Sequence, residues 1–353
     1  MKDIKNMPSI LNMIQKYDSI SIIGMNKNVG KTTTLNYILT QARGKISLGL
    51  TSIGRDGEKI DGATATEKPK IYIEKGTIIA TAKQCLLNSD ITREILKTTG
   101  INTPMGEIII CRAISDGYVE LGGPSQNFYM TLICKELIRF GCELVIVDGA
   151  LSRKTLASPW ITNATILATG AALSKSIVKV IEETSHAVEL LSLDNEKDMT
   201  VLKLANEVFC KGKIGIISRD NSIKMLDVIT SLGSSKKIVE ILDKNTSYVV
   251  IKGVVTDKLL EDIMTSTNQY KGVTFLVEDG TKLFLTREIF YKFKKQGGSI
   301  KTMNHINIVC VTANPKSPYG YEFDKHKFLD GLRNKLNVPV FDVIGGEKNE
   351  VFR

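Results

Sequence analysis

One glycine-rich stretch decides the fold: Gly24-Met25-Asn26-Lys27-Asn28-Val29-Gly30-Lys31-Thr32-Thr33. Residues 19–25 form a compact apolar run, which is typical of a buried strand, and residues 31–42 carry apolar side chains at helical spacing. The order strand, glycine loop, helix distinguishes a phosphate-binding P-loop from a chance Gly-Lys-Thr. The stretch therefore predicts a P-loop.

Each chemical role in such a loop needs a particular residue type. Backbone N–H groups surround the β-phosphate, a lysine ammonium contacts the outer phosphates, and the next hydroxyl binds Mg²⁺. Gly30, Lys31 and Thr32 match these roles. Lys27 is either a second phosphate contact or a solvated loop lysine. The predicted nucleotide-binding residues are Asn26, Lys27, Asn28, Val29, Gly30, Lys31, Thr32 and Thr33.

A magnesium-dependent nucleotide site also needs a carboxylate at the end of a neighbouring strand. Residues 144–147 are apolar and are followed by Asp148 and Gly149, so Asp148 is the predicted Mg²⁺-associated acid. Asp56 follows the expected strand 46–53 and is a second candidate, although Asp-Gly is also an ordinary turn. We expect Lys31, Asp56 and Asp148 to be catalytic, and Thr32, Asp148 and Asp56 to hold the metal.

Three cations and one further loop leave alternatives open. Arg55 lies next to Asp56, and Arg153 and Lys154 follow Asp148, so these cations either neutralise phosphate or an acidic substrate, or are solvated. Residues 168–174 lead from a strand into a helix, where a purine or a second anion would fit. The other interpretation is a plain helix start with Ser174 as its N-cap.

The order of elements predicts the α/β class, with a mostly parallel sheet. We expect a P-loop NTPase domain at residues 1–194, a linker at residues 195–198, and a smaller α/β domain at residues 199–353 that binds a partner or substrate. Further expectations are hairpins at residues 70–82 and 105–121, a helix at residues 223–232, and a strand at residues 306–311 inside the second domain.

Composition narrows the function classes. The 353 residues carry a net charge of +9, a weak indication of anionic partners. The six scattered cysteines and three scattered histidines predict neither disulfides nor a metal cluster, and no apolar run is long enough to span a bilayer. A cytoplasmic protein is expected. The aromatic, basic stretch at residues 271–301 favours a core with a solvated face over a nucleic-acid surface, because acidic residues dilute its charge.

The loop departs from the common P-loop, because five residues instead of four separate Gly24 from Gly30. This spacing, with Val29 before the second glycine, resembles the loop of dethiobiotin synthetases and related P-loop proteins. The resemblance covers residues 19–34. It implies chemistry at the ends of the second and third strands, and a nucleotide-bridged homodimer is one assembly known in that class.

Two functions remain open: an ATP-dependent ligase or kinase acting on a small carboxylate, as in dethiobiotin synthetases, and an accessory protein whose hydrolysis of ATP or GTP acts on a partner enzyme. The length of the second domain favours the accessory protein. Residues 147–154 and 166–174 resemble the P-loop subunits of reactivation factors for cobalamin-dependent lysine aminomutases. That resemblance implies a protein partner, either a second ATPase subunit or the target enzyme, with cobalamin belonging to the enzyme.

Overall fold

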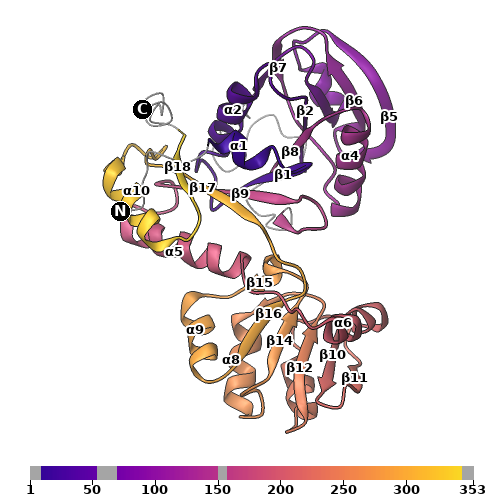
Figure 1. The fold of residues 1–353 in the computed structure, drawn as a ribbon, viewed down its shortest axis with the longest axis vertical. Coiled ribbons are helices and arrows are strands. Elements are labelled where there is room, and N and C mark those ends of the chain that lie inside the picture. The colour runs from indigo at the N-terminus through magenta and orange to yellow at the C-terminus, as the bar shows by residue number, and fades with distance from the viewer. Residues whose placement is uncertain (1–8, 54–69, 150–156, 344–353) are drawn as a thin grey trace. The chain divides into compact units, whose positions relative to one another are not determined.

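The computed structural model describes residues 9–53, 70–149 and 157–343. These residues confirm the α/β class, because helices alternate with the strands of two main sheets (Figure 1). The chain divides into two compact units. Unit 1 comprises residues 1–185 and 307–353, and unit 2 comprises residues 186–306.

Unit 1 contains a nine-stranded sheet in the order β18-β17-β9-β1-β8-β2-β4-β6-β5. Neighbours from β18 to β4 are parallel, whereas β6 is antiparallel to both β4 and β5. The sheet is therefore mostly parallel, as predicted. Its strands are β1 (Ser19–Gly24), β2 (Leu48–Ser52), β4 (Ile78–Ala82), β5 (Arg93–Thr103), β6 (Gly106–Ala113), β8 (Leu144–Asp148), β9 (Ala164–Gly170), β17 (Ile308–Asn314) and β18 (Val340–Asp342).

The central strands of this sheet are buried almost throughout, which explains their continuous apolar sequences. Helix α2 places Leu35 and Ile38 against the core that β1 and β8 form with Ile22 and Ile146. The helices of unit 1 are α1 (Ile10–Ile14), α2 (Lys31–Ala42), α3 (Lys83–Leu87), α4 (Asn127–Arg139) and α10 (Lys325–Lys335), and α5 (Ile177–Leu191) spans the division between the units.

The two predicted hairpins are wrong. Gly76 lies between β3 and β4, and Gly117 begins β7 after β6, but neither pair of consecutive strands is hydrogen-bonded together. Instead, β3 (Ile71–Ile73) pairs with β7 (Gly117–Val119), and β4 enters the large sheet between β2 and β6. Alternating polarity showed that these segments are strands, but it does not identify the partner of each strand.

Unit 2 contains a five-stranded sheet in the order β11-β10-β12-β14-β16. Its core includes Phe275, Phe290 and Phe293, so the aromatic side chains of the 271–301 stretch are mostly internal; Phe284 is exposed. The elements are α6 (Met199–Lys211), β10 (Ile214–Ser218), β11 (Ile223–Leu226), α7 (Ser235–Ile241), β12 (Thr246–Ile251), β13 (Val255–Thr256), α8 (Asp257–Ser266), β14 (Thr274–Val277), a 3₁₀ turn (Gly280–Lys282), β15 (Leu283–Phe284), α9 (Arg287–Lys295) and β16 (Ser299–Thr302).

The division between the units differs from the expected boundaries at residues 194 and 199. Strand β17 pairs with β9 in the large sheet, and β18 continues the same sheet, so residues 307–343 belong with unit 1. Figure 1 shows β17 alongside β9. Unit 2 is thus an insertion within the chain of unit 1, and local sequence signals do not reveal a return to an earlier sheet.

The predicted helix at residues 223–232 is also wrong. Residues 223–226 form β11, which pairs with β10 in an antiparallel hairpin. The hairpin turn contains Asn221 in the left-handed conformation, with φ 64°, and Asp220 accepts hydrogen bonds from Ser222. Asp, Asn and Ser favour such turns, and a short apolar run after them does not distinguish strand from helix.

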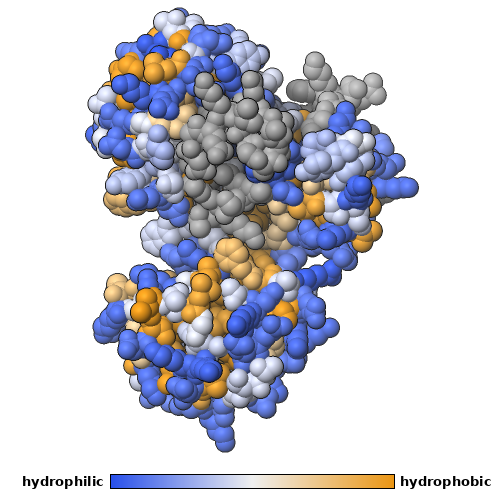
Figure 2. Space-filling view, turned by 180° about the vertical axis from the view of Figure 1, so that it is seen from behind, coloured by the Kyte–Doolittle hydropathy of each residue, from blue (hydrophilic) through white to orange (hydrophobic). Residues whose placement is uncertain are grey.

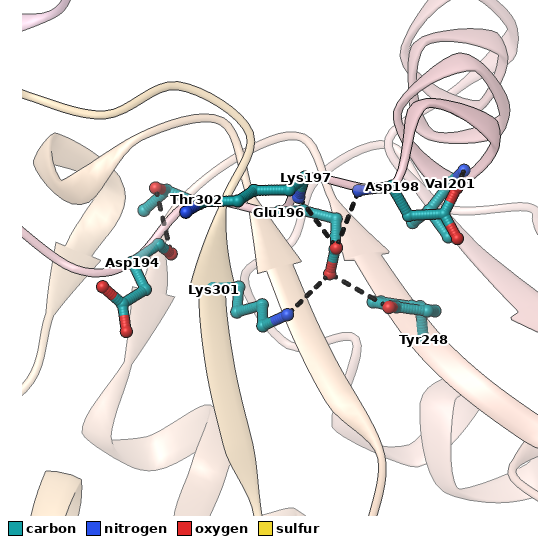
Figure 3. A network of polar contacts seen from close by, with 8 residues as sticks. All are labelled: Asp194, Glu196, Lys197, Asp198, Val201, Tyr248, Lys301 and Thr302. Carbon is teal, nitrogen blue, oxygen red and sulfur yellow. Dashed lines mark hydrogen bonds and ion pairs between the residues drawn. The ribbon is translucent and has the colours of Figure 1, made fainter.

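The predicted linker at residues 195–198 is an ordered part of unit 2 (Figure 3). The Glu196 side chain is only 6% exposed. Its carboxylate accepts hydrogen bonds from the backbone N–H groups of Lys197 (2.8 Å) and Asp198 (3.1 Å) and from the Tyr248 hydroxyl (3.0 Å). Lys301 Nζ lies 2.9 Å from Glu196 Oε2, the oxygen that also accepts from Tyr248. Glu196 therefore attaches residues 195–198 to strands β12 and β16 of the unit 2 sheet.

Burial of Glu196 opposes its ionisation, but the hydrogen bonds from Asp198, Lys301, Lys197 and Tyr248 outweigh it and lower its pKa from 4.5 to about 2. Because the folded-state pKa is the lower one, this stabilisation is complete above about pH 4.5 and is lost as the pH falls towards 2. Glu196→Gln should therefore cost about 3 kcal/mol of unfolding free energy at pH 7.

Urea denaturation of both proteins at several pH values tests this expectation. The difference between wild type and Glu196→Gln should shrink as the pH falls from 5 to the lowest value at which both still fold. A difference that does not change with pH would contradict the assigned role. Glu207→Gln is the matched control, since Glu207 pairs with Lys211 on the exposed surface of α6, where ion pairs contribute little.

Hydrophilic residues cover most of the face shown in Figure 2, with small groups of hydrophobic residues between them. Scattered apolar residues of this kind are normal on protein surfaces. Among the residues that the structure describes, no helix has the length and apolar character needed to cross a membrane.

Candidate functional site

The glycine-rich loop lies at the centre of the carboxyl edge of the large sheet. It connects β1 to α2, and β1 lies between β8 and β9. The register places Ile22 beside Asp148 and Gly24 beside Ala168. Three strand ends therefore meet at the loop, as expected where parallel sheets bind ligands.

Left-handed backbone and close contacts determine the shape of the loop. Asn28 has φ 59° and Gly30 has φ 99°. Val29 is buried against Ala168 and Ala172 and anchors the middle of the loop. A Cβ atom on Gly24 would lie 2.9 Å from Val29 Cγ2 and 3.0 Å from Lys31 Nζ, so a larger residue would displace Val29 or the Lys31 side chain.

The first N–H groups of α2 have no partner within the helix itself. Gly30 is the N-cap residue and provides no side-chain cap, and no acidic residue lies in the first turn, which contains Lys31, Thr32 and Thr33. Free N–H groups and the positive end of the helix dipole favour an anion at this position. The arrangement suits phosphate.

Lys31 and Asp148 determine the charge at this edge. Lys31 Nζ donates to the Asn26 carbonyl oxygen at 3.3 Å. Burial lowers the pKa of Lys31; Asp148 opposes the decrease and Lys27 adds to it. Burial also raises the pKa of Asp148 to about 6, against the effect of Lys31. Each charged form is thus poorly solvated and would be stabilised by a ligand of opposite charge.

Asp148 Oδ1 lies at the end of β8, beside β1. The atom is buried and has no hydrogen-bond partner among the described residues. A buried polar atom without a partner costs free energy, so it requires an explanation. A hydrated Mg²⁺ ion fits, because Mg²⁺ takes one or two carboxylates and fills its other positions with water and phosphate oxygens. The described residues contain no cluster of three or more His, Cys, Asp or Glu side chains that could hold a metal alone.

The last residues of β17 contact the loop, and sequence reasoning missed them. Thr312 Oγ1 lies 2.8 Å from Thr34 Oγ1 in the first turns of α2. Asn314 Nδ2 donates to the Asn28 carbonyl oxygen at 3.4 Å. The signal was the polar Asn-Pro pair directly after an apolar strand, but assigning that strand to the second domain hid its relevance.

The segment after β7 also reaches this edge. Gly123 lies so close to the end of β2 that an added Cβ atom would be 1.8 Å from the Ser52 carbonyl oxygen. The Gly122-Gly123 pair therefore allows two backbone segments to approach closely, and it leads the chain towards α4.

The loop after β9 starts a helix later than predicted. Helix α5 begins at Ile177, and Ser176 Oγ accepts the Lys179 N–H at 3.3 Å, so Ser176 caps the helix. The prediction of Ser174 as N-cap is wrong; its hydroxyl accepts the Ser176 N–H instead. Asp56, Arg55, Arg153 and Lys154 lie outside the described residues.

Comparison with known proteins returned no match: no family model, no curated protein and no solved structure matches this chain.

Proposed function

We propose that the chain binds a nucleoside triphosphate with Mg²⁺ at residues 24–33 and hydrolyses it. One observation above all supports this: the Lys31 ammonium, at the start of the helix after β1, interacts electrostatically with Asp148 at the end of the adjacent parallel strand β8. The buried Oδ1 of Asp148 has no hydrogen-bond partner among the residues that the structure describes. A cation beside a glycine loop and an acid on the neighbouring strand are what Mg²⁺-bound phosphates require.

Each residue has a proposed task in binding. The loop N–H groups and the first turn of α2 surround the β-phosphate. Lys31 Nζ exchanges the Asn26 carbonyl oxygen for phosphate oxygens, which are stronger acceptors. Thr32 and Asp148 would hold Mg²⁺, with Asp56 as a further candidate. When bound, the ion would neutralise phosphate charge and orient the phosphates.

Hydrolysis then transfers the γ-phosphoryl group to water. Water forms a bond to the γ-phosphorus and the bond to the β–γ bridging oxygen breaks. The nucleoside diphosphate and inorganic phosphate leave, and the proton lost by the water is taken up by the released phosphate or by solvent. Negative charge develops on the transferred group and on the bridging oxygen, and Lys31 stabilises it there. Asp56 is the candidate for orienting the attacking water.

We propose further that hydrolysis acts on a protein partner. Unit 2 has its own five-stranded sheet and its own hydrophobic core, so it is more than a loop that covers a small substrate. We infer that unit 2 binds this partner, which is either a second ATPase subunit or a target enzyme. A cobalamin-dependent aminomutase is the target that the sequence resemblance suggests. The alternative is a ligase or kinase that uses a small carboxylate.

Phosphate release from ATP and from GTP distinguishes these functions. Hydrolysis should be slow for the chain alone and should increase when a cobalamin-dependent lysine aminomutase is added. Turnover stimulated by a small carboxylic acid, such as diaminopelargonic acid with bicarbonate, would contradict the accessory function and support the ligase. Measuring both nucleotides also determines which base the protein prefers.

A further inference from the structure

The end of β17 holds the loop through a residue far away in the chain. Asn314 is only 7% exposed and lies beside Gly170 of β9. Its Nδ2 donates to the carbonyl oxygen of Asn28, 286 residues earlier. Its Cβ lies 3.3 Å from the position that a Cβ atom on Gly30 would take. One side chain therefore donates to one left-handed residue of the loop and lies where a side chain on the other would be crowded.

Local contacts fix the orientation of the Asn314 side chain. Its Oδ1 accepts the Lys316 N–H at 2.9 Å, which leaves Nδ2 as the group facing the loop. Its own carbonyl oxygen accepts the Ala171 N–H at 2.8 Å. A Cβ atom on Gly170 would lie 2.5 Å from that oxygen, so β9 and β17 approach too closely for any other residue. The contacts with Lys316 and Ala171 therefore fix Asn314 independently of the loop.

The contact has a consequence for phosphate binding. Asn28 is in the left-handed conformation, which asparagine adopts more readily than most other non-glycine residues. The surrounding contacts must still select this conformation over the commoner ones. Because the peptide unit is planar, fixing the Asn28 carbonyl oxygen also fixes the Val29 N–H, which points to the opposite side of the peptide. Asn314 thus orients a donor group of the loop.

We propose that Asn314 is a positioning residue for the phosphate loop, acting through the Asn28 carbonyl and Gly30, and that it does not contact the nucleotide base. This proposal rests on the proposed nucleotide-binding function. It predicts that loss of the Asn314 amide weakens binding of any ligand with a triphosphate, whether or not the ligand has a base.

Inorganic tripolyphosphate is the decisive probe, because it has the phosphates and no base. Calorimetric titration with Mg²⁺ present should give dissociation constants for ATP and tripolyphosphate that both rise about fivefold in Asn314→Ala, the effect of one net hydrogen bond. Their ratio should stay at the wild-type value. The stoichiometry reports the folded fraction separately.

Two results would overturn the proposal: unchanged affinity for both ligands, or weaker ATP binding with unchanged tripolyphosphate binding, which would show a base contact. Asn102→Ala is the matched control, since Asn102 Nδ2 also donates to a carbonyl oxygen at 3.4 Å, that of Gly100, on the exposed edge strand β5.

A second variant serves if Asn314→Ala does not fold. Asn314→Asp keeps the Cβ contact and the acceptor for Lys316 but lacks the donor. It should weaken the binding of both ATP and tripolyphosphate and leave the ratio of the dissociation constants for ATP and GTP unchanged. A change in that ratio would contradict the proposal. The proposed function is tested first and separately. If wild-type protein binds neither ATP nor tripolyphosphate, that function fails and Asn314 has no loop ligand to position.

Discussion

Lys31→Ala is expected to remove nearly all nucleotide hydrolysis and to weaken ATP binding by at least about tenfold. A charge-assisted contact to phosphate contributes about 1.5–3 kcal/mol, which is roughly a tenfold to hundredfold change in affinity. Hydrolysis should fall further, by about two to three orders of magnitude, because the ammonium also stabilises charge that develops only in the transition state. Titration with ATP and a phosphate-release assay measure the two effects.

Two other lysines make this experiment specific. Lys45→Ala changes an exposed lysine just after α2 and should leave both measurements at wild-type values. Lys27→Ala separates the two interpretations of Lys27: weaker binding identifies a phosphate contact, and unchanged binding identifies a solvated loop residue. Full activity of Lys31→Ala would exclude the loop as the phosphate site.

Asp148→Asn is expected to lower Mg²⁺-dependent hydrolysis by about two orders of magnitude while the fold is kept. Asparagine has nearly the same shape, but it lacks the charge that would hold the metal's water shell. The substitution affects the buried Oδ1, which has no hydrogen-bond partner within residues 9–53, 70–149 and 157–343. Phosphate release as a function of Mg²⁺ concentration should show a higher requirement for the metal in the variant.

Binding measured without Mg²⁺ provides the internal comparison. Removing a negative charge near the phosphates should leave metal-free ATP binding unchanged or tighter, so a general loss of affinity would indicate damage to the fold. Asp330→Asn, at an exposed acid of α10, is the control for a lost carboxylate. Unchanged Mg²⁺ dependence in Asp148→Asn would contradict the assignment.

The neighbourhood of the loop was predictable because its signals are local. An apolar strand, a glycine loop and a helix follow one another within residues 19–42, and a second apolar strand ends in Asp148. The parallel pairing of β1 with β8 then brings Asp148 to the same edge. No long-range information beyond the usual βαβ topology was needed.

The features that could not be predicted depend on contacts between distant segments. Asn314 reaches the loop only because β17 returns to β9 after the whole of unit 2. The charged residues at 195–198 suggested a linker, yet Lys301 and Tyr248 from distant strands contact the Glu196 carboxylate. In both places, composition indicated polar side chains but not which groups would form hydrogen bonds with them.

A crystal structure with Mg²⁺ and a non-hydrolysable ATP analogue tests the central claim most directly. The β-phosphate should lie within the loop of residues 24–33, Lys31 Nζ should have left the Asn26 carbonyl oxygen for phosphate oxygens, and Asp148 should face the ion or its water. A triphosphate bound elsewhere, or a Lys31 side chain still bonded to Asn26, would contradict the claim.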